Sequence, residues 1–179
     1  MKNSSSSRSL ESELSFPVVS LESIRPSSVN PPIPLKLTQN TGLQCILHIA
    51  RDSPRSDLIV SVLTTTNTNT SKTINNFHFE ATASSKVNYL IFFLFITKTK
   101  HFSFYLKNVR VKLQTPSASD LSLYNPILPP QAITQIILVS NPNKETVRIN
   151  YKLSYYLSGE QINETGDIDH GFPSSIDIV

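Results

Sequence analysis

The sequence predicts an all-β protein, an antiparallel β-sandwich, and three observations favour that class. No segment of the 179 residues keeps the apolar period of an amphipathic helix over three turns. Six or more short segments instead alternate apolar and polar residues, or form short apolar runs, as strands do. Turn signals rich in Pro, Asn and Ser separate these segments. Short strands at such spacing are typical of a sandwich.

The first residues differ in composition from the rest of the chain. Residues 1–15 are rich in serine, and we expect a disordered linker there. Residues 16–179 are expected to form one domain, since this length supports a single core. The four prolines between residues 21 and 34 exclude helix and confine any strand to a sheet edge.

The strands follow in order along the domain. We expect them at residues 43–50, 58–63, 77–83, 109–113, 132–139 and 147–157. Residues 64–76 are rich in Thr and Asn without an apolar period, and this predicts a loop. Residues 161–179 predict only a weak strand or an irregular tail.

The segment 147–157 has the clearest pattern. Apolar and aromatic side chains occupy every second position from Val147 to Tyr155, and polar ones lie between them. The polar positions include Arg148 and Lys152, with no carboxylate among them. This strand is therefore both a structural element and a candidate surface for binding anions.

Charge and cysteine content exclude several classes of protein. The net charge of +3 is mild, and the sequence lacks the clustered lysines and arginines of a nucleic-acid-binding protein. Cys45 is the only cysteine, so neither an internal disulfide nor a cysteine zinc site is possible. It lies in an alternating run and is expected in the core. The amino terminus has no apolar signal core, which favours a cytosol-facing protein.

No pattern of catalytic or metal-binding residues is present. His48 and His78 fall on the polar sides of their strands without a partner motif, so no catalytic triad is predicted. Asp167, Asp169 and His170 are expected in a solvated loop rather than in a metal site. The four glycines form no phosphate-binding loop. The sequence thus predicts no enzyme, no metal and no cofactor.

Residues 87–108 differ from the pattern on either side. Residues 89–96 are almost entirely apolar, and lysines follow at once. A transmembrane helix needs about 20 apolar residues, so no direct membrane insertion is expected. Considered alone, the run is either a buried strand or, if exposed, an aggregation hazard.

Several short motifs, in order along the chain, resemble one known family. They include Leu-Glu-Ser-Ile-Arg-Pro at 21–26, His-Ile-Ala-Arg-Asp at 48–52, Tyr-Asn-Pro-Ile at 124–127, Ala-Ile-Thr-Gln at 132–135 and Gly-Asp-Ile-Asp at 166–169. From about residue 19 to residue 173, the chain resembles the γ-adaptin ear (GAE) domain. It is especially similar to the carboxyl-terminal ear of GGA proteins, the Golgi-localised, γ-ear-containing, Arf-binding clathrin adaptors.

The resemblance implies an immunoglobulin-like β-sandwich that binds peptides and is not an enzyme. Such ears recruit accessory trafficking proteins through acidic-phenylalanine motifs such as Asp-Phe-Gly-Pro-Leu. The implied location is the cytosolic face of the trans-Golgi network and endosomes. The implied state is a monomeric domain.

The resemblance also implies the residues of the binding site. A basic rim is expected at Arg148 and Lys152, with Lys86 or Lys107 across from them. An apolar pocket is expected from Leu113, Pro116 and Ala83. Asn150 stands where the family has a third basic residue, so the salt-sensitive part of binding is expected to be weaker.

Residues 87–108 interrupt the family pattern. Joining Lys86 to Val109 restores the family spacing, and we hypothesise that the segment is a retained intron. If it is a real insert, it could block or reshape the groove. Two alternatives stay open: a structural ear with an impaired groove, and a basic β-module for nucleic acid that uses Arg110, Lys112, Arg148 and Lys152. Against the latter, Tyr151 and Tyr155 lie on the core side and cannot stack on bases.

Overall fold

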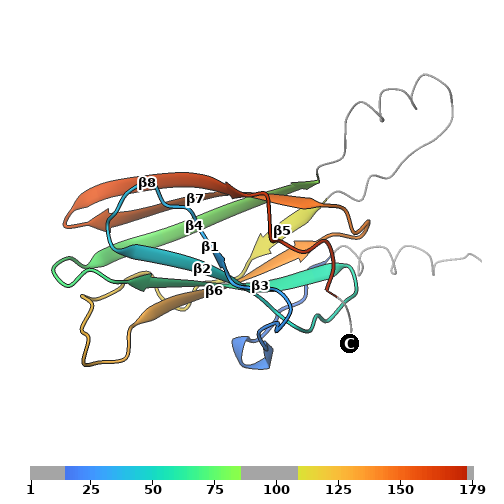
Figure 1. Cartoon of the computed structure of the whole chain (residues 1–179), viewed down its shortest axis with the longest axis horizontal. Helices are drawn as coiled ribbons and strands as arrows, with labels where there is room; N and C mark the ends of the chain where they lie inside the picture. Colours follow the sequence, from blue (N-terminus) through green and yellow to red (C-terminus); the bar gives the residue numbers. More distant parts are fainter. Residues whose placement is uncertain (1–14, 86–108, 177–179) are drawn as a thin grey trace, which may run out of the picture.

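The protein is a sandwich of two antiparallel sheets (Figure 1), and the computed structural model describes residues 15–85 and 109–176. One sheet has the strand order β1-β2-β3-β6-β5 and the other β4-β7-β8. The strands are β1 Ile33–Pro34, β2 Leu43–Ile49, β3 Leu58–Asn67, β4 Ile74–Ser85, β5 Arg110–Leu113, β6 Ala132–Ser140, β7 Val147–Leu157 and β8 Glu160–Ile168. The predicted all-β, immunoglobulin-like sandwich is confirmed. The predicted linker up to residue 14 and the segment 87–108 lie outside the described residues.

One expectation about an individual element is wrong, and another is only partly right. The predicted loop at 64–76 is shorter, because β3 runs to Asn67 and β4 begins at Ile74. The threonines at the end of β3 pair with both β2 and β6, and β-branched residues suit such a central strand. The weak strand or tail expected after residue 160 includes a regular nine-residue strand, β8. Its inward positions include Glu164 and Gly166, which hide the apolar alternation.

The edge strand expected in the proline-rich amino-terminal segment is confirmed, but a single 3₁₀ turn forms ahead of the prolines, within the range where helix was excluded. The two-residue β1 lies at the edge of its sheet, as the prolines predicted. The only helix in the described part of the chain is a 3₁₀ turn at Leu21–Ser23, which ends before Pro26.

The main core lies between the two sheets. Tyr155 is fully buried there, and the ring of Tyr151 stacks on Phe79 with 6.2 Å between ring centroids. Cys45 is 2% exposed, which confirms its predicted place in the core. Burial raises the pKa of its thiol to about 11. This thiol is therefore protonated at neutral pH and chemically inert.

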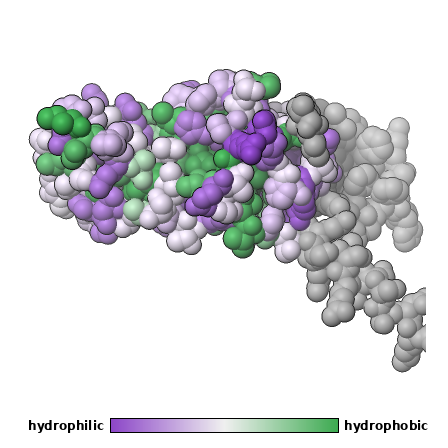
Figure 2. All heavy atoms as spheres, turned by 90° about the horizontal axis from the view of Figure 1, so that it is seen from below, coloured by the Kyte–Doolittle hydropathy of each residue, from purple (hydrophilic) through white to green (hydrophobic). Residues whose placement is uncertain are grey.

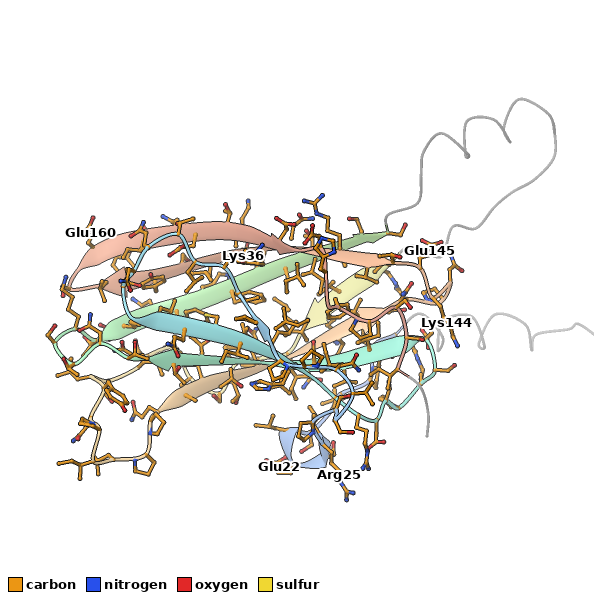
Figure 3. The ribbon with its side chains drawn as sticks, viewed as in Figure 1. Glu22, Arg25, Lys36, Lys144, Glu145 and Glu160 are labelled. Carbon is orange, nitrogen blue, oxygen red and sulfur yellow. The ribbon has the colours of Figure 1, made fainter. Side chains whose placement is uncertain are left out.

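A second apolar cluster lies on the outer face of β3 and β6. It consists of Ala50, Leu58, Val60, Val62, Ile136 and Leu138. Residues 15–27, called here the amino-terminal strap, cover it with Phe16, Val19 and Ile24. Figure 3 shows Glu22 and Arg25 of the strap on this side of the molecule. The first six residues of β3 are all buried because the sheet is covered on both faces.

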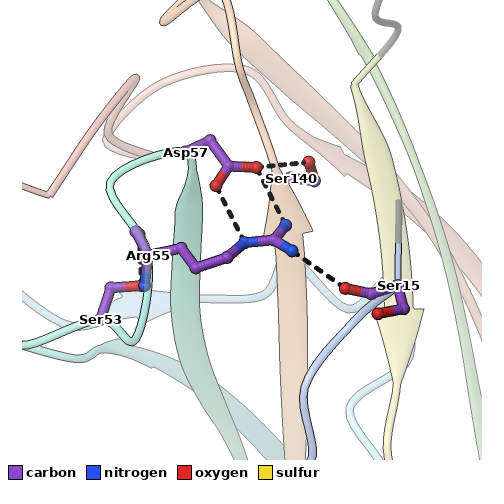
Figure 4. Close-up of polar contacts among 5 residues, drawn as sticks. All are labelled: Ser15, Ser53, Arg55, Asp57 and Ser140. Atoms are coloured by element: carbon purple, nitrogen blue, oxygen red, sulfur yellow. Dashed lines mark hydrogen bonds and ion pairs between the residues drawn. The ribbon is translucent and has the colours of Figure 1, made fainter. Parts of the chain in front are cut away.

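Polar contacts fix the start of the strap (Figure 4). Arg55 donates to both oxygens of Asp57, with Nε–Oδ1 and Nη2–Oδ2 distances of 3.0 Å. Its Nη1 donates to the carbonyl oxygen of Ser15 at 3.0 Å, and Ser140 Oγ donates to Asp57 at 3.1 Å. This network connects the strap to the β2–β3 turn and to the end of β6.

The loop between β5 and β6 projects from one end of the molecule (Figure 1) and exposes apolar side chains. Ile127 is 89% exposed and Leu128 61% exposed. In Figure 2, hydrophobic residues gather at this left-hand end of the face that is seen from below. Leu128 donates its backbone N–H to the carbonyl of Asn125 at 3.2 Å, which closes a turn at the tip.

Polar side chains from the inner face of the three-stranded sheet hold the loop between β1 and β2. Tyr151 Oη donates to the carbonyl of Lys36 at 2.8 Å, and Tyr155 Oη lies 2.7 Å from Thr41 Oγ1. The buried carboxylate of Glu164 accepts hydrogen bonds from the N–H and the hydroxyl of Thr38, at 2.6 and 2.8 Å. The loop therefore closes the side of the sandwich near β8. The opposite side is formed by the edge strands β4 and β5, which contact each other.

Candidate functional site

The polar face of β7 is the centre of the candidate site. The strand alternates buried and exposed residues along nearly its whole length, as predicted. Arg148, Asn150 and Lys152 are all exposed on the outer face of the three-stranded sheet. In their register with β4 they stand opposite Ser84, Thr82 and Glu80, respectively.

Two carboxylates lie beside these cations. Glu80 of β4 is directly opposite Lys152, and Asp167 of β8 is directly opposite Asn150. Arg148 Nη2 is 3.0 Å from Asp167 Oδ2, so the two side chains form an ion pair. β7 itself carries no carboxylate. Among the described residues, the outer face of the three-stranded sheet carries two positive side chains, Arg148 and Lys152, and two negative ones, Glu80 and Asp167. Neighbouring strands supply the negative charges, and the pattern of a single strand cannot reveal them.

The position of Asp167 corrects a prediction. It was expected in a solvated loop, but it belongs to β8 and pairs with Asn150. The next acidic residue, Asp169, follows the strand and lies 3.3 Å from His170 Nε2. Across residues 15–85 and 109–176, no group of three His, Cys, Asp or Glu side chains could hold a metal ion.

Lys152 is in a different situation from Arg148. Its neighbours across the sheet are Glu80 on β4 and Thr165 on β8. Glu80 lies 3.3 Å from His78 Nε2 on its own strand. Within the described part of the chain, Lys152 has no carboxylate at ion-pair distance. Its ammonium group is therefore available to a ligand.

A shallow cavity of about 520 Å³ lies on this face. It is lined by Glu80, Ala81, Thr82, Asn150, Tyr151, Lys152, Thr165, Gly166 and Asp167. Gly166 is opposite Tyr151, and a Cβ atom there would lie 2.3 Å from the Tyr151 hydroxyl. The absence of a side chain at Gly166 therefore lets the tyrosine ring lie across β8.

The residues predicted for the apolar pocket lie along the edge formed by β4 and β5. Ala83 on β4 and Leu113 on β5 are half-buried, and both pack against the main core. Pro116 follows β5 and is also half-buried. Because β4 and β5 contact each other, the structure brings these residues to the same side of the sandwich. Lys86 and Lys107 lie outside the described residues.

Sequence reasoning missed Glu80 and Asp167 as members of the site. The alternation of residues 77–83 does place Glu80 on the polar side of its strand. The signal for Asp167 is weaker, because the pattern of residues 161–179 predicts only a weak strand or an irregular tail. Only the strand order and register show that both residues flank the cations.

Comparisons with known proteins agree with this architecture. The family model for the adaptin C-terminal domain matches residues 101–173. The human ADP-ribosylation factor-binding protein GGA1 is 34% identical over 165 residues, covering 91% of this chain and 22% of that protein. The mouse GGA3 protein is 34% identical over 157 residues, covering 87% of this chain and 18% of that protein.

Solved structures support the same fold. The crystal structure of the GAE domain of GGA2p from Saccharomyces cerevisiae superposes with a TM-score of 0.52 at 18% sequence identity. The match covers 78% of this chain and 96% of that one. The yeast GGA1 GAE domain gives the same TM-score of 0.52.

The fold and the matched sequence thus define an adaptor ear, a β-sandwich appendage. More specifically, the chain is a γ-adaptin ear (GAE) domain similar to those of GGA proteins, and the resemblance predicted from the sequence is confirmed. The chain spans about a fifth of the length of these relatives. Among the described residues, no helix is long and apolar enough to cross a membrane.

Proposed function

We propose that this chain is the peptide-binding ear of a clathrin adaptor and has no enzymatic activity. Its ligands are accessory proteins of vesicle transport at the trans-Golgi network and endosomes, which carry acidic-phenylalanine motifs. The observation that carries the proposal is the exposed ammonium of Lys152 on a strand next to the β4–β5 edge. An acidic and aromatic ligand needs a cation and an apolar surface close together.

The physical basis is the recognition of an extended peptide at the edge of a sheet. The ligand's phenylalanine ring would contact the half-buried Ala83, Leu113 and Pro116, where part of their apolar surface is open. Burying an aromatic side chain contributes about 1.5–3 kcal/mol. The ligand's carboxylate would approach Lys152, which orients the peptide more than it adds to affinity. We expect micromolar binding, roughly 8 kcal/mol.

The charge balance of the face argues against one alternative and in favour of the other. A nucleic-acid-binding surface needs a net positive field, whereas among the described residues of this face Glu80 and Asp167 offset Arg148 and Lys152. Tyr151 and Tyr155 are buried and cannot act as a stacking platform. A structural ear with an impaired groove is favoured by Asn150 and by the Arg148–Asp167 pair, which together leave one unpaired cation among the described residues of β7.

We also propose the domain organisation predicted from the sequence. Residues 16–179 form one ear, preceded by a serine-rich linker and interrupted by an atypical segment at 87–108. The two described ranges that flank this segment belong to one sandwich. Sequencing transcripts tests whether the segment is a retained intron. A message that contains it in most copies excludes that origin.

A binding assay tests the function directly. The full chain is titrated into a fluorescein-labelled peptide that contains Asp-Phe-Gly-Pro-Leu, and fluorescence anisotropy is followed. We expect saturable binding with a micromolar Kd. Charge reversal by Lys152→Glu should weaken binding by about tenfold or more, because the ligand's carboxylate would then meet a negative side chain.

Lys72→Glu is the matched control. It makes the same change of charge at an exposed lysine in the β3–β4 loop, so it should leave binding within about twofold. Equal losses in both variants would show a nonspecific charge effect and reject the site. Binding of a DNA or RNA oligonucleotide, but not of the peptide, would favour the nucleic-acid alternative. Binding of neither would favour the impaired groove.

A further inference from the structure

Arg148 is already engaged within the protein. Its Nη2 atom lies 3.0 Å from Asp167 Oδ2, and the two side chains are 48% and 38% exposed. Asp167 stands opposite Asn150, which is the next residue after Arg148 on the outer face of β7. A long side chain reaches such a diagonal neighbour on an adjacent antiparallel strand. The β7–β8 pairing therefore places a carboxylate where a ligand's carboxylate would meet Arg148.

Lys152 lacks such an internal partner in the described part of the chain. Glu80 is opposite it in register, but the Glu80 carboxylate lies 3.3 Å from His78 Nε2. Thr165, on the other side, is uncharged. The two cations of β7 thus differ: one is held by an acidic side chain of β8, and the other is open.

We propose that Asp167 determines the charge specificity of the peptide site, an inference that rests on the proposed function. A ligand's first carboxylate binds at Lys152. A second carboxylate of the ligand adds little affinity, because it must displace Asp167 from Arg148. The site therefore accepts peptides with one acidic residue about as well as peptides with two. Asp167 acts through its ion pair with Arg148, so it determines specificity without contacting the ligand itself.

Two labelled peptides measure this property, Gly-Asp-Phe-Gly-Pro-Leu and Asp-Asp-Phe-Gly-Pro-Leu. With the full wild-type chain, their Kd values should agree within about twofold. Asp167→Asn frees Arg148, so the peptide with two acidic residues should bind about fivefold more tightly than to wild type, the effect of one exposed ion pair. The peptide with one acidic residue should gain less.

Glu160→Gln is the matched control. It removes one negative charge from the same strand, at the end of the β7–β8 hairpin (Figure 3), seven residues from Asp167. At about 3.3 Å per residue, that distance exceeds the screening length of physiological salt. We expect both peptides to keep their affinity within about 1.5-fold. An equal gain in both variants would reflect net charge alone and would overturn the inference.

A double-mutant comparison isolates the part played by Arg148. Arg148→Gln should change the affinity for the peptide with two acidic residues by less than about twofold in wild type, but by about fivefold in Asp167→Asn. Lys152→Gln should weaken binding equally in both backgrounds. If Arg148→Gln weakens binding by the same factor in the wild-type and Asp167→Asn backgrounds, Asp167 does not control Arg148, and the inference is wrong.

The outcomes also separate this inference from the proposed function. Wild-type binding that requires Lys152 but is unaffected by Asp167→Asn would retain the proposed function and reject the inference. Binding that appears only in Asp167→Asn would support the inference and show that wild type has an impaired groove. The absence of peptide binding in every variant would reject both.

Discussion

At the scale of single residues, Gly166 has the most constrained position in the site. It faces Tyr151 across β7 and β8, and the tyrosine ring occupies the space where another residue would have a side chain. Tyr151 also stacks on Phe79 and donates to the carbonyl of Lys36. One missing side chain therefore permits a contact that links the three-stranded sheet to the β1–β2 loop.

Gly166→Ala should destabilise the protein. The new Cβ would lie 2.3 Å from Tyr151 Oη and 2.4 Å from Cζ, so the ring must move and lose its contacts. Overpacking of this kind costs about 1–3 kcal/mol. Urea denaturation followed by circular dichroism measures the loss. In a Tyr151→Leu background the same substitution should cost less, and equal costs in both backgrounds would contradict the steric explanation.

Burial at single positions was predictable, but contacts between strands were not. Cys45 was correctly placed in the core because its neighbours alternate in polarity. The Arg148–Asp167 ion pair joins residues 19 positions apart and depends on the register of β7 and β8. No local pattern contains that register. The charge balance of the candidate site therefore required the structure.

At the scale of elements, the amino-terminal strap is the segment whose role was least evident from the sequence. Its prolines indicated only what it could not form. In the structure, Gln114 donates to the carbonyl of Val19 and accepts from its N–H, at 2.8 and 2.9 Å. Phe16 packs on the outer apolar cluster, and the Arg110 guanidinium lies 5.4 Å from the centroid of its ring. The strap is therefore part of the folded domain.

Phe16→Ala tests this conclusion. The ring is half-buried against the cluster and also contacts a cation, so its removal should lower the free energy of unfolding by about 1–2 kcal/mol. Val18→Ala is the control within the same segment, because Val18 is 89% exposed and should have little effect. Thermal denaturation of both variants provides the comparison. Equal stability of Phe16→Ala and wild type would show that the strap does not stabilise the sheet.

The elements that the sequence predicted best are those with one covered face. β2 and β7 alternate regularly, and their patterns gave them nearly their observed bounds. β8 was underestimated because Glu164 and Gly166 occupy inward positions. Glu164 is nevertheless 2% exposed, since its carboxylate accepts the hydrogen bonds of Thr38. A buried polar residue whose hydrogen bonds are all satisfied within the protein cannot be told from an exposed polar residue by the sequence pattern.

At the scale of the whole molecule, the site depends on how the two sheets meet. β7 provides the cations, β4 and β8 provide the carboxylates, and β5 adds half-buried apolar residues from the other sheet. The fold class followed from alternation and turn signals, which are local. The meeting of β4 and β5 on one side is a property of the topology, and no local pattern contains it.

The buried ionisable groups of the core predict how stability depends on pH. Burial raises the pKa of the Cys45 thiol from 9.0 to about 11, and it also raises the pKa values of Tyr151 and Tyr155 above 10.0. In the unfolded chain these groups lose their protons first. The unfolded state is therefore favoured as the pH rises, and the free energy of unfolding should fall progressively above pH 9.

Urea titrations at pH 7, 9 and 10 measure this effect, with Cys45→Ala for comparison. The variant lacks the thiol, so its stability should decline less between pH 9 and pH 10, even if its stability at pH 7 is lower. The tyrosines remain in both proteins and act at higher pH, which keeps their contribution separate. A decline of equal size in both proteins would show that the Cys45 thiol is accessible to water, against its 2% exposure.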